Sequence, residues 1–135
     1  METMTTMPTE ISLLGWSVVL LLVQLVLQAT PAVIELGPPY AFSPRDERKV
    51  VKGVVAARLE RAFYNLLETY PVFVALALAL AVTGKTGGLG ATGAHVWFWA
   101  RIVYVPLYAA GIPFVRTLVW TISAIGLILM LIALL

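Results

Sequence analysis

Long stretches without a charged residue are the feature that most limits what this chain can fold into. The last of them covers residues 117–135, where 19 consecutive residues include no Asp, Glu, Lys or Arg. A helix needs about 20 apolar residues to cross a hydrocarbon layer roughly 30 Å thick. Of the 135 residues, 61% are hydrophobic and 12% are charged, against roughly 25% charged in an ordinary soluble domain. The sequence therefore predicts an all-α integral membrane protein.

Turn-forming segments divide the chain into four expected helices within one domain. The first connection, residues 35–49, contains three prolines and a cluster of charges, and the second, residues 83–93, is rich in glycine. Residues 111–113 form a third, tight connection with the sequence Gly-Ile-Pro. We expect helices over residues 11–32, 45–82, 94–110 and 114–135, packed as a four-helix bundle within the single domain 1–135.

Basic residues are distributed unevenly over these connections. One of them, Lys85, lies at the second connection. Five lie at or beside the first and third: Arg45, Arg48, Lys49, Lys52 and Arg116. Because basic residues accumulate on the cytoplasmic side of membrane proteins, we expect the first and third connections to face the cytoplasm and both chain termini to face outward.

Polar residues form a stripe on each of two expected helices. Four residues of the second helix have offsets 0, 3, 7 and 10, which at about 100° per residue fall within an arc of roughly 80°. Three residues of the third helix fall within an arc of roughly 60°. Charged groups facing lipid cost at least about 2.5 to 3.5 kcal/mol each at the bilayer centre, so both stripes should face protein or a wet cavity. Together with one residue of the fourth helix they make up the polar seam: Arg58, Arg61, Asn65, Glu68, Arg101, Tyr104, Tyr108 and Arg116.

The polar seam has surplus positive charge. It contains four arginines and one carboxylate, Glu68, which leaves three positive charges uncompensated. A purely structural network should approach neutrality, because an unpaired buried cation is expensive. An anionic ligand could supply the missing charge, since guanidinium groups match carboxylates in shape.

A structural interpretation of the same residues stays open. Arg58 and Arg61 could extend to the cytoplasmic surface, and Glu68 could pair with Arg101 and hold two helices together. Tyr104 and the other seam tyrosine could equally be packing or interfacial aromatics.

Composition excludes several kinds of chemistry. The chain has no cysteine and one histidine, so we expect no metal site, and any thiol chemistry must come from a bound ligand. The nine Lys and Arg residues do not form a basic tract, so we expect no nucleic acid partner.

Two separated blocks of the sequence carry a recognisable pattern. The first, ARLERAFYNLLETYPVF at residues 57–73, has Arg, two residues, Arg, three residues, Asn, two residues and Glu, and ends with an aromatic residue, Pro, any residue and Phe. The second is ARIVYVPLYAAGIPFVR at residues 100–116. Both resemble conserved blocks of the MAPEG family, the membrane-associated proteins in eicosanoid and glutathione metabolism. With the topology, the resemblance extends over nearly the whole chain from Ile11 onward, and the first connection is similar to that of compact bacterial members.

This resemblance implies a homotrimer of four-helix protomers in the inner membrane of a bacterium, with glutathione bound between adjacent protomers near the cytoplasmic side. By position it assigns six residues to the carboxylates, amides and amine of glutathione: Arg61, Asn65, Glu68, Arg101, Tyr104 and Tyr108. Arg58, on the same stripe, is a further candidate for binding. Arg116 matches the family's arginine that stabilises the thiolate, and we expect it to be catalytic. A nearby guanidinium lowers the pKa of a thiol by favouring its charged form, and the thiolate is the reactive nucleophile.

Two positions depart from the eicosanoid-producing members. Residues 32–37 offer only Glu35 where those members have basic residues, and Thr69 stands where they commonly have Tyr. We therefore do not expect leukotriene or prostaglandin synthesis. The function we expect is a glutathione-dependent transferase or peroxidase that acts on a lipophilic electrophile arriving through the bilayer. The alternative is a non-catalytic scaffold or accessory subunit of the same fold that binds lipid or another anion.

Overall fold

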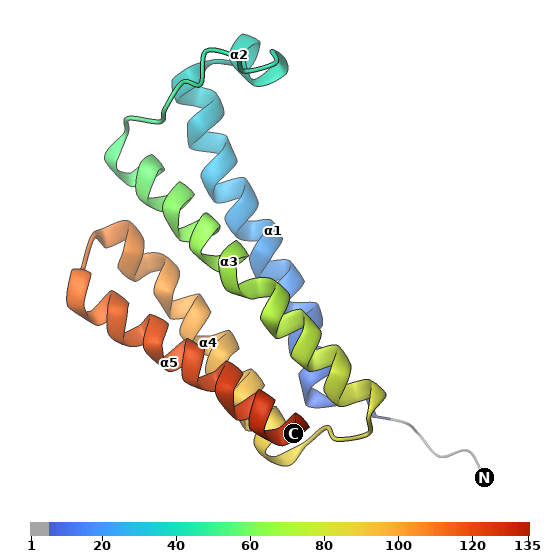
Figure 1. Cartoon of the computed structure of the whole chain (residues 1–135). Coiled ribbons are helices and arrows are strands. Elements are labelled where there is room, and N and C mark those ends of the chain that lie inside the picture. Colours follow the sequence, from blue (N-terminus) through green and yellow to red (C-terminus); the bar gives the residue numbers. More distant parts are fainter. Residues whose placement is uncertain (1–5) are drawn as a thin grey trace.

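The computed structural model describes residues 6–135. The regular secondary structure in that range consists of helices, joined by loops and turns. The four long helices are α1 (Thr9–Leu36), α3 (Val54–Val82), α4 (Gly88–Ala110) and α5 (Pro113–Leu134), and the short helix α2 (Pro38–Phe42) follows α1. The chain runs up and down (Figure 1). The start of α1, the α3–α4 connection and the C-terminus lie at one end, whereas α2 and the α4–α5 turn lie toward the other. The structure confirms the expected all-helical class, and residues 6–135 form five helices, four of them long.

The outside of the molecule is apolar. Large side chains that point away from the protein include Trp16, Val26 and Phe114, which are 60%, 61% and 88% exposed. Three helices, α1, α3 and α5, are long and apolar enough to cross a membrane. Such a surface suits hydrocarbon as its solvent. The chain is an integral membrane protein.

The first connection is built differently from our expectation. α1 continues several residues further than expected, to Leu36, and α2 follows directly. The expected start of the second long helix at Arg45 is wrong: residues 43–53 form a loop, and α3 begins at Val54. Arg45 and Arg48 have φ angles of 61° and 49°, a left-handed conformation that a right-handed helix does not accommodate.

Glu35, near the end of α1, binds the backbone directly before α3. Its carboxylate accepts hydrogen bonds from the backbone N–H groups of Lys52, at 2.6 Å, and Gly53, at 2.5 Å. Backbone donors at a helix start have no partner within the helix, and a side-chain oxygen commonly satisfies them. Here that oxygen comes from a different helix, so the contact also ties α1 to α3.

The second half of the glycine-rich segment, residues 88–93, is part of a helix. α4 begins at Gly88, inside this segment, and not near residue 94 as expected. At its closest approach to α5, a Cβ added to Gly93 would lie 2.5 Å from the carbonyl oxygen of Gly126. Small residues allow two membrane helices to approach closely. α4 and α5 therefore lie side by side along their lengths (Figure 1).

An aromatic core joins the helix pair α1 and α3 to the helix pair α4 and α5. The ring of Phe73 on α3 is stacked on the ring of Trp97 on α4, with 3.9 Å between centroids, and both side chains are fully buried. Leu13 of α1 and Met130 of α5 belong to the same core cluster. This packing fixes α4 against α3, which is the contact that forms the polar seam.

Candidate anion-binding site

Arg101 of α4 lies at the centre of the polar seam. Its side chain is 1% exposed, and Nη1 donates a hydrogen bond to Oδ1 of Asn65 on α3, at 2.9 Å. The guanidinium carbon lies 4.5 Å from the ring centroid of Tyr104, which is also buried. The structure therefore brings together Asn65, Arg101 and Tyr104. Arg101 and Tyr104 lie one turn apart on α4, and Asn65 faces Arg101 from α3.

Arg101 has hydrogen-bonding capacity that no residue in the described part of the chain uses. Its Nε and Nη2 atoms are buried and have no partner among residues 6–135. A buried donor without a partner costs about 1–3 kcal/mol, and more when it is charged. Within residues 6–135 there is one ion pair, the exposed contact of Lys49 with Glu47 at 3.5 Å. Arg101 thus forms no ion pair with a carboxylate in that part of the chain.

Two more arginines, Arg61 and Arg116, extend the polar seam beyond Arg101. The guanidinium carbon of Arg116, on α5, lies 4.5 Å from the ring centroid of Tyr108, and that of Arg61, on α3, lies 6.0 Å from the same centroid. The rings of Tyr108 and Tyr104 meet edge to face at 5.5 Å. Three arginines from three helices therefore surround a pair of tyrosines, and each of them can attract an anion placed there.

Glu68 and Arg58 are placed differently from the rest. Glu68 is exposed on α3 and makes no ion pair with Arg101 or any other cation in residues 6–135, so the pairing considered from the sequence is not what the structure shows. Arg58 donates from Nη1 to the carbonyl oxygen of Ala109 at 3.2 Å and lies against Gly111 in the α4–α5 turn. It therefore ties α3 to that turn instead of facing Arg101.

Three buried polar residues of α1, namely Glu10, Ser17 and Gln24, are not apparent from the stripe pattern. Glu10 is fully buried, and its Oε2 accepts a hydrogen bond from the backbone N–H of Gly87 at 2.9 Å, so it fastens α1 to the α3–α4 connection. Gln24 is 2% exposed, and its Oε1 has no partner within the described residues. In the sequence all three stand among several other polar residues of α1, so none is singled out. No group of three potential metal ligands occurs among residues 6–135.

Comparison with known proteins identifies the family. The sequence model of the MAPEG family matches residues 13–135, which include all of α2, α3, α4 and α5 and most of α1. No curated protein matches the chain. The match confirms the resemblance seen in residues 57–73 and 100–116, the two segments that supply every residue of the polar seam. Membership supports, in general terms, a membrane function related to glutathione or eicosanoids. The chain belongs to the MAPEG family.

Proposed function

We propose that the protein is a membrane-embedded glutathione-dependent transferase or peroxidase that acts on a lipophilic electrophile. The observation that supports this most is Arg101, which is buried, charged and bonded only to a neutral amide in the described residues. Glutathione is a net anion with two carboxylates, and guanidinium groups bind carboxylates through paired hydrogen bonds. The residues present therefore fit this ligand in charge and in donor type.

In this proposal the residues of the polar seam have separate tasks. Arg101 offers Nε and Nη2 to one carboxylate, while Asn65 holds the guanidinium from its other side. Arg116 lies over the Tyr108 ring and favours the charged form of a nearby thiol, which lowers the pKa of that thiol. Glutathione supplies a thiolate nucleophile when it is bound. The apolar exterior of the protein gives a lipophilic substrate access from the bilayer.

We propose further that the protein works as a homotrimer. Arg61 and Glu68 are exposed on the same side of α3. Charged groups that face hydrocarbon are expensive, so this side needs a protein surface or a ligand to cover it. A second copy of the chain would close the polar seam there and enclose glutathione between protomers.

The proposed orientation follows from the positions of the basic residues. Four of them lie in the loop at the α2 end, whereas Lys85 lies near the opposite end, where its Nζ donates to the carbonyl oxygen of Leu134 at 2.8 Å. We infer that all four long helices cross the inner membrane of a bacterium, with the α2 end in the cytoplasm and both termini outside. A reporter fused next to Lys85 tests this orientation, because cytoplasmic activity of the reporter would contradict it.

Ligand-dependent stability and activity test the proposed function together. We expect reduced glutathione at millimolar concentration to raise the Tm of the detergent-purified protein, and we expect the protein to conjugate a lipophilic aryl halide or reduce a lipid hydroperoxide. Both effects should be lost in Arg101→Met, which removes the buried charge and keeps an apolar side chain of similar length. Both should persist in Arg48→Gln, an exposed position in the loop. Absence of a glutathione response in the natural sequence would overturn the proposal.

Two observations favour a second candidate, a non-catalytic scaffold or accessory subunit that binds lipid or another anion. Glu35 occupies the end of α1 where a basic clamp would stand, and its carboxylate is used by the backbone at Lys52 and Gly53. The hydroxyl of Thr69 lies 3.5 Å from the carbonyl oxygen of Leu66 in its own helix. Stabilisation by anionic lipid together with no response to glutathione would favour this candidate.

A further inference from the structure

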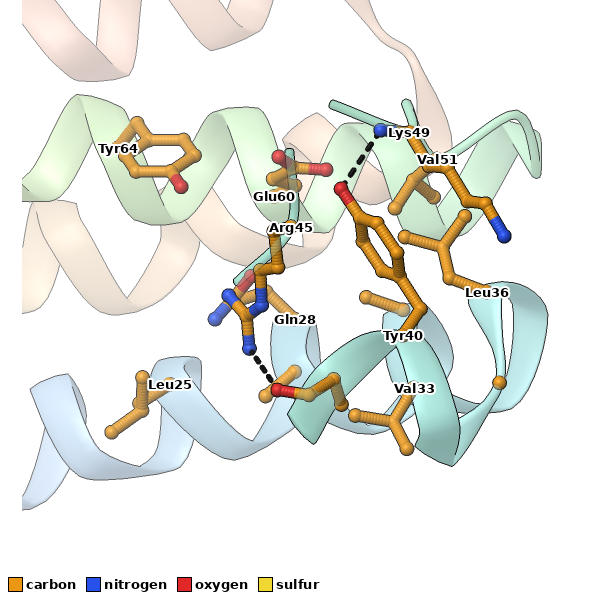
Figure 2. Close-up of a pocket in the computed structure, with 14 residues that line it drawn as sticks. Leu25, Gln28, Val33, Leu36, Tyr40, Arg45, Lys49, Val51, Glu60 and Tyr64 are labelled. Atoms are coloured by element: carbon orange, nitrogen blue, oxygen red, sulfur yellow. Dashed lines mark hydrogen bonds between the residues drawn. The ribbon is translucent and has the colours of Figure 1, made fainter. Parts of the chain in front are cut away.

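A pocket of about 370 Å³ lies at the α2 end of the molecule, separate from the polar seam. It is lined by α1, α2, the loop of residues 43–53 and α3 (Figure 2). One wall is an apolar strip of α1 that includes Leu25, Ala29 and Val33. Leu25 and Val33 are 41% and 37% exposed, so this strip continues onto the outer, lipid-facing surface of α1.

The mouth of this pocket is basic. Figure 2 shows Arg45 reaching between α1 and α3, and Lys49 at the rim beside Tyr40. Arg45 Nη2 donates to the carbonyl oxygen of Ala41 at 3.2 Å, and the backbone N–H of Lys49 donates to the Tyr40 hydroxyl at 2.8 Å. The ammonium nitrogen of Lys49 lies 5.1 Å from the Tyr40 ring centroid. These contacts fold the loop back onto α2 and keep both cations at the pocket.

The charges at this mouth do not cancel. Glu60 also lines the pocket, but it forms no ion pair with Arg45 or Lys49 in the described part of the chain. Lys49 contacts Glu47 at 3.5 Å, and both side chains are solvent-exposed, so water weakens that pair. Arg45 uses one guanidinium nitrogen on a backbone carbonyl, which leaves its charge available. A ligand that combines an anion with an apolar tail would match both parts of the pocket.

We propose that this pocket binds an anionic phospholipid, with the phosphate at Arg45 and Lys49 and an acyl chain along the apolar strip of α1. The basic loop lies at the end of the helices, where headgroups are found, and the strip opens toward the hydrocarbon layer. Lys and Arg near a membrane surface attract anionic headgroups, and a phosphate offers acceptors to both side chains. The bound lipid contacts α1, the loop and α3 together.

The test measures the Tm of the purified protein with short-chain phosphatidylglycerol, short-chain phosphatidylcholine or inorganic phosphate. We expect phosphatidylglycerol to raise the Tm well above the effect of phosphatidylcholine, and inorganic phosphate not to reproduce that rise. The double variant Arg45→Gln/Lys49→Gln should weaken the apparent Kd for phosphatidylglycerol at least about tenfold. The matched control is Arg48→Gln/Lys52→Gln, which removes the same charge from the same loop, and Arg48 has a positive φ like Arg45.

Two further variants keep the test decisive. Glu60→Gln leaves both cations in place and removes the carboxylate from the pocket, so it should tighten binding of phosphatidylglycerol. Arg101→Met should keep the lipid response, which separates this pocket from the polar seam. Equal weakening in the two double variants, an equal response to phosphatidylcholine, or an equal rise with inorganic phosphate would each overturn the proposal.

Discussion

Arg101 on α4 donates a hydrogen bond from Nη1 to Oδ1 of Asn65 on α3, across 2.9 Å. The acceptor is a neutral amide, so this contact orients the guanidinium group without cancelling its charge. Arg101 is 1% exposed, and two of its donors have no partner among residues 6–135. Buried charges in proteins are normally paired. The pair Arg101–Asn65 therefore positions a cation for a partner that the described chain does not itself supply.

Asn65→Asp should weaken binding of glutathione. The substitution is nearly isosteric and places a carboxylate at hydrogen-bonding distance from Arg101, so it supplies internally the charge that we assign to the ligand. We expect the Kd for glutathione to rise at least about tenfold, a change of about 1.4 kcal/mol, with no loss of Tm in the absence of ligand. Isothermal titration calorimetry and thermal unfolding measure the two quantities.

The control for that substitution is Gln28→Glu. It also converts an amide to a carboxylate, but Gln28 lies on α1 and lines the pocket at the α2 end. The Kd for glutathione should be unchanged. If Asn65→Asp binds glutathione as tightly as the natural sequence, the charge of Arg101 is not what holds the ligand.

Arg116→Ala should shift the pH dependence of glutathione activation. Arg116 stabilises the thiolate in our proposal, so its removal raises the pKa of the bound thiol. The thiolate then forms at higher pH: the rate at neutral pH falls, and part of it returns as the pH is raised. Ultraviolet absorbance of the thiolate, followed against pH with glutathione at saturation, measures this shift directly. An unchanged titration curve would remove the role of Arg116.

Glu35→Ala should destabilise the protein without affecting glutathione binding directly. The substitution leaves the backbone N–H groups of Lys52 and Gly53 without their acceptor at the start of α3. We expect the free energy of unfolding to fall by about 1–2 kcal/mol, as for the loss of a helix cap. Glu47→Ala removes an exposed ion pair and should cost less than about 1 kcal/mol. Equal effects in a denaturant titration in detergent would show that the contact of Glu35 contributes nothing special.

Gly126→Ala should disrupt the packing of α5 on α4. Its Cβ would lie 2.6 Å from the carbonyl oxygen of Gly93 and 2.7 Å from the backbone nitrogen of Trp97, and backbone atoms cannot move aside as a side chain can. Overpacking of this kind costs about 1–3 kcal/mol. Gly15→Ala is the control, because nothing lies within 4 Å of its added Cβ. It should stabilise α1 by about 0.5–1 kcal/mol. Thermal unfolding of the two variants distinguishes them by sign.

Composition was sufficient to predict an all-helical membrane protein, but one helix boundary depends on a tertiary contact. Arg45 and the residues after it are compatible with a helix in sequence. In the structure α3 starts at Val54, directly after Gly53, whose backbone N–H binds the carboxylate of Glu35 on α1. A pattern within one segment contains no information about an acceptor that comes from another segment.

The polar seam was predictable as a face and not as a set of contacts. Helical spacing places Arg58, Asn65 and Glu68 on one side of α3. Spacing does not say which of them lies against α4. Asn65 meets Arg101, Glu68 is exposed and Arg58 binds the α4–α5 turn, because the position of each along α3 relative to α4 decides its partner.

A density map of the protein purified in the presence of glutathione is the most direct test of the central claim that Arg101 holds an anion. We predict density for a carboxylate within hydrogen-bonding distance of Nε and Nη2 of Arg101, with the sulfur near Arg116. A map in which Glu68 or another carboxylate of the protein pairs with Arg101, and in which no ligand contacts the guanidinium group, would contradict it.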